Sequence, residues 1–175
     1  MLKKKITFGL DAGSIDRAIA EIQAFKQELQ AKMDKFRERL AEEIKQEAQM
    51  GFNISVVDDI IKGGTPHNAE VTVSVSSSGD ISVVVANGED AVWCEFGSGV
   101  YHNGSAGTSP NPYGVELGYI IGSYGQGKGK QTAWGFYDEN KQLVITRGTP
   151  ATMPMFNAAQ SVATRAINIA KEVFA

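Results

Sequence analysis

The chain has 175 residues, with 42% apolar and 21% charged side chains, which suits one globular domain and excludes a chain that is disordered throughout. Its net charge of −3 argues against a surface that grips nucleic acid through many phosphate contacts. No apolar run approaches the ~18 residues of a transmembrane helix, and the short run after residues 3–5 does not make a secretory signal.

The first segment is predicted to be a helix over residues 14–50. Residues 1–50 carry 19 of the 37 charged side chains, and apolar residues recur among them at intervals of three and four. These apolar residues are Ile15, Ile19, Ile22, Phe25, Leu29, Met33, Phe36, Leu40, Ile44 and Ala48. Asp11 or Ser14 can cap the start, and Gly51 can end the helix. An unbroken helix would measure roughly 55 Å, so it either bends, breaks, or projects from the domain with an apolar stripe that needs a partner.

Residues 54–96 are predicted to be β-rich. Residues 70–75 alternate apolar and polar side chains, residues 77–80 supply turn chemistry, and residues 81–85 alternate again, which predicts a hairpin. Residues 54–57 are a candidate for another strand. Ile6 and Phe8 are candidates for an edge strand.

Residues 97–130 hold 10 of the 19 glycines and are predicted to form a long, flexible Gly-rich loop, with a short ordered piece over 115–121. Residues 132–147 are predicted to form a second hairpin, and residues 154–174 a C-terminal helix that Thr152 caps. The fold class expected from these elements is a single α+β domain over 1–175. An antiparallel sheet of about four to five strands would be packed by the two helices.

The search for catalytic residues, metal ligands and cofactor-binding residues selects none. Residues 122–128 match the first seven positions of a P-loop, but Gly129 replaces the required Ser or Thr, and a strand rather than a helix is expected next. His67, His102 and Cys94 have no metal-ligand spacing. We expect Cys94 to be a buried apolar side chain, and a single cysteine fits a reducing cytoplasm.

Glu95 is the charged residue that stands out, because its neighbours are apolar or aromatic. A carboxylate is costly to bury without a partner. We therefore expect Glu95 to be exposed on an alternating strand, to pair with Arg147, or to cap backbone N–H groups. Trp134, Phe136 and Tyr137 are expected to be core residues of the second hairpin or anchors of an interface.

Two sequence elements, and the order of the predicted helices and hairpins, carry a resemblance. Residues 95–99 read Glu-Phe-Gly-Ser-Gly, and residues 150–156 read Pro-Ala-Thr-Met-Pro-Met-Phe. The chain thereby resembles the tail-completion or head–tail joining (neck) proteins of long-tailed double-stranded-DNA phages. Members typically have Thr in place of Ser98 and a shorter element before the last helix. The Thr-Gly-x-Leu element that usually follows their first helix is absent, since residues 51–54 read Gly-Phe-Asn-Ile.

The resemblance implies a structural protein of a phage or prophage virion rather than an enzyme. Such proteins form or join a ring at the head–tail junction or the head-proximal end of the tail. The implied partners are further copies in a ring, with a hexamer favoured, together with tail-tube and connector proteins, but no membrane. DNA would pass through the lumen without specific binding. The implied location is the virion, after assembly in the host cytoplasm.

The resemblance and the reading of the residues together select a set of candidate assembly residues. They are Trp93, Glu95, Phe96, Gly97, Gly99, Trp134, Phe136, Tyr137, Arg147, Gly148, Pro150, Pro154 and Phe156. The apolar face of the first helix and the aromatic hairpin are the expected ring surfaces, and residues 97–130 are expected to become ordered on assembly. Two alternatives stay open: a nucleotide- or small-ligand-binding module that uses the Gly-rich loop, and a ring protein of a phage-tail-like injection apparatus.

Overall fold

The computed structural model describes residues 4–57, 60–62, 67–98, 109–118, 134–137 and 139–175. Three helices and seven short antiparallel strands form the described part, which confirms the predicted α+β class. The helices are α1 (Ala12–Asn53), α2 (Asp90–Phe96) and α3 (Pro154–Phe174). The strands are β1 (Val56–Val57), β2 (Ile60–Lys62), β3 (His67–Asn68), β4 (Thr72–Ser78), β5 (Ile81–Asn87), β6 (Trp134–Tyr137) and β7 (Leu143–Thr146).

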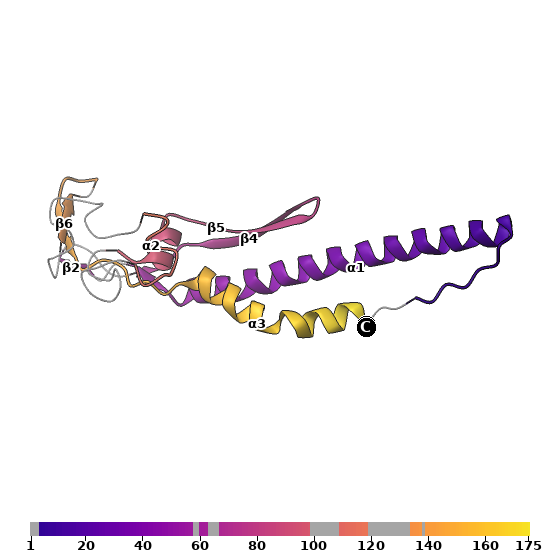
Figure 1. Cartoon of the computed structure of the whole chain (residues 1–175). Coiled ribbons are helices and arrows are strands. Elements are labelled where there is room, and N and C mark those ends of the chain that lie inside the picture. Colours follow the sequence, from indigo (N-terminus) through magenta and orange to yellow (C-terminus); the bar gives the residue numbers. More distant parts are fainter. Residues whose placement is uncertain (1–3, 58–59, 63–66, 99–108, 119–133, 138) are drawn as a thin grey trace.

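Helix α1 is continuous over 42 residues and projects beyond the rest of the molecule (Figure 1). It starts at Asp11, whose side chain accepts a hydrogen bond from the Ser14 N–H at 2.9 Å. Of the three alternatives expected for a helix of this length, the structure therefore takes projection. Residues 4–9 contain no strand, so the expected edge strand at Ile6 and Phe8 is wrong.

Gly51 does not end α1 as expected, because the helix continues to Asn53. A Cβ atom at position 51 would lie 2.8 Å from the Cβ of Pro154, the first residue of α3. The glycine therefore serves close packing between two helices rather than helix termination.

Helix α3 packs antiparallel along the second half of α1, and its predicted bounds of 154–174 are confirmed. Contacts run from Gly51 against Pro154 to Phe36, whose ring meets that of Phe174 edge-to-face at 6.1 Å. Beside that aromatic pair, the Lys32 Nζ donates a hydrogen bond to the Ala175 carbonyl at 3.1 Å. These contacts show that α3 ends opposite Lys32, so about twenty residues of α1 extend past it.

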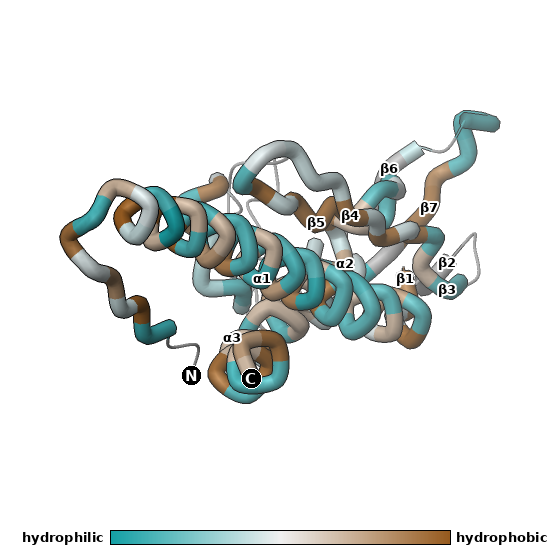
Figure 2. The backbone as a smooth tube through the Cα atoms, turned by 90° about the vertical axis from the view of Figure 1, so that its right-hand side faces the viewer, coloured by the Kyte–Doolittle hydropathy of each residue, from teal (hydrophilic) through white to brown (hydrophobic). Residues whose placement is uncertain are grey.

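The β4–β5 hairpin packs against α1 on the side away from α3 (Figures 1 and 2). Its register pairs Thr72 with Asn87 and Ser78 with Ile81, which confirms the predicted hairpin. The side chain of Gln49 fixes it to α1, because its Oε1 accepts from the Val73 N–H at 2.8 Å and its Nε2 donates to the Val71 carbonyl at 2.9 Å.

The expected single sheet of four to five strands is wrong, because the described strands form three separate sheets. Strand β1 pairs with β3, β4 pairs with β5, and the third sheet has the order β2-β7-β6. The β6–β7 pairing confirms the predicted second hairpin, and β1 confirms the strand expected within 54–57. Helix α2 follows β5 directly in the sequence. The next strand along the chain, β6, belongs to a different sheet from β5.

Residues 90–96 form helix α2, although they were expected to belong to the β-rich region. The buried residues Ala91, Cys94 and Glu95 follow helical spacing, whereas Val92 and Trp93 are 38% and 40% exposed. Periodicity in so short an apolar run fits a strand as well as a helix. The core lies where α2 and the hairpin meet the C-terminal end of α1, around Cys94 and Phe52, which are both 0% exposed.

None of the helices in the described part of the chain has the length and apolar character that crossing a bilayer requires.

Candidate assembly site

The carboxylate of Glu95 lies at the N-terminal end of α3. Its Oε1 accepts hydrogen bonds from the Asn111 side-chain amide at 2.8 Å and from the Phe156 N–H at 3.0 Å. Its Oε2 accepts from the Met155 N–H at 2.8 Å. Glu95 is only 7% exposed, so three donors satisfy a buried carboxylate. Of the three options expected for Glu95, the structure takes the backbone cap.

Helix α3 needs this cap because its own first residues supply none. Met153 stands at the N-cap position with φ +52°, in the left-handed region, and its side chain has no oxygen to accept a bond. Pro154 follows and has no N–H, so the first N–H groups without an intrahelical acceptor belong to Met155 and Phe156. Glu95 of α2 accepts from both, and its negative charge lies at the positive end of the helix dipole.

Thr152 was expected to cap α3 and instead links the segment before α3 to α1 and α2. Its Oγ1 lies 2.7 Å from the Oγ of Ser55 and donates to the Cys94 carbonyl at 3.3 Å. The same carbonyl accepts from the backbone N–H groups of Thr152 and Met153 at 2.8 and 3.1 Å. Helix α2 therefore holds the start of α3 through its backbone as well as through Glu95.

Residues 97–98 continue this joint toward residues 148–149. Gly97 has φ +74° and lets the chain turn sharply out of α2, as Gly148 does with φ +99° before the Pro150 segment. The Ser98 N–H donates to the Thr149 carbonyl at 2.9 Å, and the Thr149 N–H donates to the Ser98 Oγ at 2.8 Å. We call the whole arrangement, residues 94–98 with Ser55, Asn111 and 148–156, the α2–α3 joint.

Asn111 was missed in the sequence because it lies within the predicted flexible loop. It is 3% exposed, and its Oδ1 accepts from the Tyr113 N–H at 3.0 Å while its Nδ2 binds Glu95. The Tyr113 ring meets that of Phe156 edge-to-face at 6.1 Å. Residues 109–118 are thus a bonded turn and not a flexible loop. The signal was the run Asn111-Pro112-Tyr113-Gly114, which has strong turn chemistry.

Burial raises the pKa of Glu95 from its ordinary value of 4.5, while the bonds from Met155, Phe156 and Asn111 act in the opposite direction. Burial has the larger effect, so the net shift is upward. Burial also raises the pKa of the neighbouring Cys94 thiol to about 11, with a contribution from Asp90. A thiol that stays protonated at neutral pH is a poor nucleophile, so Cys94 acts as a core residue.

Among the described residues, Arg147 and Tyr137 lie outside the α2–α3 joint. Arg147 is exposed and is not among the partners of the Glu95 carboxylate, so the pair expected within the chain is wrong. Tyr137, at the end of β6, is 72% exposed. The side chains of Trp134 and Phe136 lie outside the described part, as do Gly99 and most of the predicted 97–130 loop, including its P-loop-like residues 122–128.

Comparison of the chain with protein-family models, curated proteins and solved structures found no match. The described residues also hold no group of three or more His, Cys, Asp or Glu side chains that could bind a metal ion. The hydrogen bonds of the α2–α3 joint fix the orientation of α3 relative to α2, and both helices pack against the end of α1.

Proposed function

We propose that this chain is a structural subunit of a phage or prophage virion. It forms or joins a ring at the head–tail junction or the head-proximal end of the tail. The observation that supports the proposal is the α2–α3 joint. Residues 95–99 and 150–156 carry the resemblance to neck proteins, and Glu95 from the first element binds the Met155 and Phe156 N–H groups of the second. A structural unit explains why these two distant elements occur together in one chain.

Exposed apolar side chains support assembly with other copies. Strand β5 carries Ile81, Val83 and Val85 on its outer face, exposed by 65%, 49% and 38%. The β6–β7 hairpin carries Tyr137 and Leu143, exposed by 72% and 47%, and lies at the far end of the molecule from the tip of α1 (Figure 1). A closed ring joins two different patches of neighbouring subunits. These two patches, on different sheets, meet that requirement.

The proposed partners are copies of the chain in a ring, a hexamer by the resemblance, and the tail-tube and connector proteins on its two sides. DNA passes through the lumen without specific binding, in keeping with the net charge of −3. The proposed location is the assembled virion.

Light scattering over a range of concentrations, with negative-stain imaging of the same fractions, tests the ring. Rings would support the proposal and give the copy number. Some assembly proteins form their ring only on a template. A monomer would therefore be tested further by pull-down with tail-tube and connector proteins. A monomer that binds neither would contradict the proposal, and a melting temperature raised by a nucleotide would favour the ligand-binding alternative instead.

A further inference from the structure

The projecting half of α1 carries a row of apolar side chains that remain in contact with water. Ile15, Ile19, Ile22, Leu29 and Met33 are between 39% and 55% exposed. With Lys26 they are separated by four, three, four, three and four residues, which is the repeat of a two-helix coiled coil. We call these six residues the α1 stripe.

The α1 stripe continues the face of α1 that is buried further along the helix. On that face Phe36 meets Phe174 of α3, and Ala41 and Ala48 are 5% and 0% exposed. The cover ends with α3, opposite Lys32. Neither α3 nor the β4–β5 hairpin reaches the first half of α1 (Figure 1). The stripe is therefore a core-forming face that neither α3 nor the β4–β5 hairpin covers in the part of the chain that the structure describes.

We propose that the α1 stripe binds the α1 stripe of a second copy of this chain, with the two helices antiparallel. In the register centred on residue 24, Ile15 lies opposite Met33 of the second copy, and Ile19 lies opposite its Leu29. Ile22 lies opposite Lys26. The overlap then runs from residue 15 to residue 33 and ends where α3 begins to cover α1.

Charge selects the antiparallel orientation over the parallel one. In a parallel pair, Lys26 would face Lys26 of the second copy inside the seam, and Lys32 of each copy would flank Arg37 of the other, so like charges would meet once in the seam and once on each side of it. The antiparallel register instead places the aliphatic stem of Lys26 against Ile22 and leaves its amine free to reach water. Helix α3 also packs antiparallel on α1, so the second copy would continue the path of α3 in the same direction.

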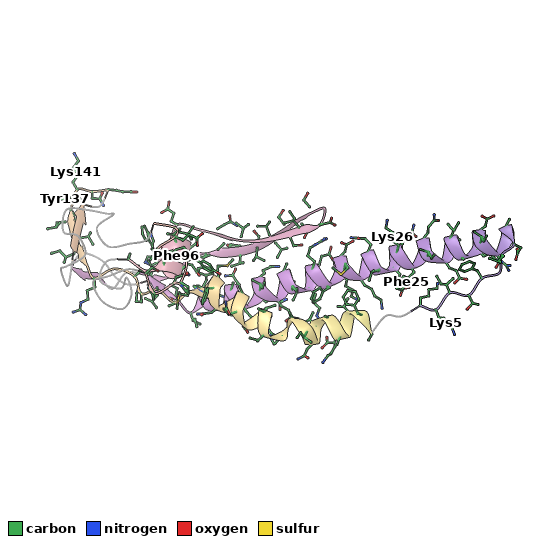
Figure 3. The ribbon with its side chains drawn as sticks, in the orientation of Figure 1. Lys5, Phe25, Lys26, Phe96, Tyr137 and Lys141 are labelled. Carbon is green, nitrogen blue, oxygen red and sulfur yellow. The ribbon has the colours of Figure 1, made fainter. Side chains whose placement is uncertain are left out.

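The N-terminal segment leaves the stripe open. Lys5 and Phe25 lie on one side of α1 and Lys26 on the other (Figure 3). Ala18, seven residues before Phe25 on the same flank, is 7% exposed. The segment before α1 therefore runs along the flank that contains Ala18 and Phe25 and not along the α1 stripe.

The size of the contact predicts a weak pair. Two helices about 10 Å wide that overlap along about 29 Å cover roughly 300 Å² of each other, less than the ~800 Å² per partner of a standard interface. The contact is also isologous and closes at two copies, so it is separate from the contacts that would build a ring. The pairing does not depend on the proposed virion function.

Cysteine cross-linking of the full chain tests the pairing and its direction. Ile19→Cys and Leu29→Cys are made as separate variants, and the native Cys94 does not interfere because it is fully buried. On mild oxidation, a mixture of the two variants should give a cross-linked dimer, whereas either variant alone should not. In the antiparallel register, identical positions lie about 15 Å apart along the helix axis, beyond the roughly 7 Å between Cα atoms that a disulfide allows.

Sedimentation from about 10 μM to about 1 mM measures the strength of the pair. Ile19→Glu should weaken dimerisation about tenfold or more, because it places a charge against Leu29 of the second copy in the seam. Ile167→Glu is the matched control, since Ile167 is a 71% exposed isoleucine on the outside of α3, and it should leave dimerisation unchanged. Cross-linked homodimers from each single variant, with no excess in the mixture, would overturn the antiparallel register. A protein that stays monomeric at the highest concentration and forms no cross-link in the mixture would overturn the pairing.

Discussion

Glu95 is the residue on which the start of α3 depends, since it supplies the acceptor for two N–H groups that Met153 and Pro154 leave unpaired. We expect Glu95→Gln to lower the free energy of unfolding by about 1–3 kcal/mol, because the amide brings an N–H donor against N–H donors. Urea denaturation at neutral pH measures this. Glu89→Gln is the control, as Glu89 is exposed and its side chain makes no cap bond in α2. Equal stabilities for the two variants would show that the cap is dispensable.

The raised pKa of Glu95 predicts a pH dependence with a definite sign. Its carboxyl group holds its proton more tightly in the folded state than its ordinary value of 4.5 implies. Its contribution to the free energy of unfolding is therefore complete below pH 4.5 and is lost as the pH rises through the raised pKa. The destabilisation caused by Glu95→Gln should accordingly be larger at pH 4 than at pH 7. If the destabilisation by Glu95→Gln instead grows with pH, the pKa of Glu95 is lowered in the folded state, and the hydrogen bonds to α3 outweigh burial.

Cys94 reports on the opening of the core. It is 0% exposed and its pKa is raised to about 11, so the thiol is protected both because a reagent cannot reach it and because it stays protonated. We expect a thiol reagent at pH 8 to react with native protein at least ~100-fold more slowly than with urea-unfolded protein. Reaction at the same rate in both states would place the thiol outside the core.

At the scale of elements, the packing of α3 on α1 depends on the absence of a side chain at Gly51. A Cβ there would lie 2.8 Å from the Pro154 Cβ, so Gly51→Ala should lower the free energy of unfolding by about 1–3 kcal/mol despite the better helix propensity of alanine.

Gly13→Ala is the matched control in the same helix. A Cβ at position 13 would meet only the Asp11 Oδ1, at an ordinary 3.6 Å. This variant should gain about 0.5–1 kcal/mol from helix propensity. Thermal melts of both variants check the opposite signs, and a stabilised Gly51→Ala protein would contradict the close approach of the two helices.

The long elements could be predicted from the sequence because each repeats its pattern several times. The apolar spacing of α1 and α3 and the alternation in β4 and β5 locate these four elements to within a few residues. Helix α2 could not be recognised, because seven residues give less than two full turns of evidence and its apolar residues suit a strand equally well.

The candidate site was predicted only in part, since its central bonds join residues far apart in the sequence. The unusual setting of Glu95 could be read from its neighbours, and a backbone cap was among the options. Its partners Asn111 and Phe156 could not be predicted, because no pattern in the neighbouring sequence relates them to position 95. The cap expected from Thr152 failed for the same reason: its hydroxyl finds a tertiary partner, Ser55, 97 residues away.

At the scale of the whole molecule, the chain has a packed body and a projecting arm. The body contains the α2–α3 joint, the sheets and the second half of α1. The arm is the first half of α1 with the segment before it (Figure 1). The two parts suggest different contacts, with rings built from patches on the body and pairs built from the arm.

The arm also affects how the protein moves through solution. Helix α1 alone measures about 63 Å, whereas a compact chain of this length has a radius of gyration near ~16 Å. Such a rod increases hydrodynamic friction without adding mass, so a single subunit should leave a gel-filtration column earlier than a globular standard of 18.8 kDa. An elution volume that suggests a dimer is therefore the expected behaviour of one elongated subunit, and the number of copies has to be read from mass rather than from size.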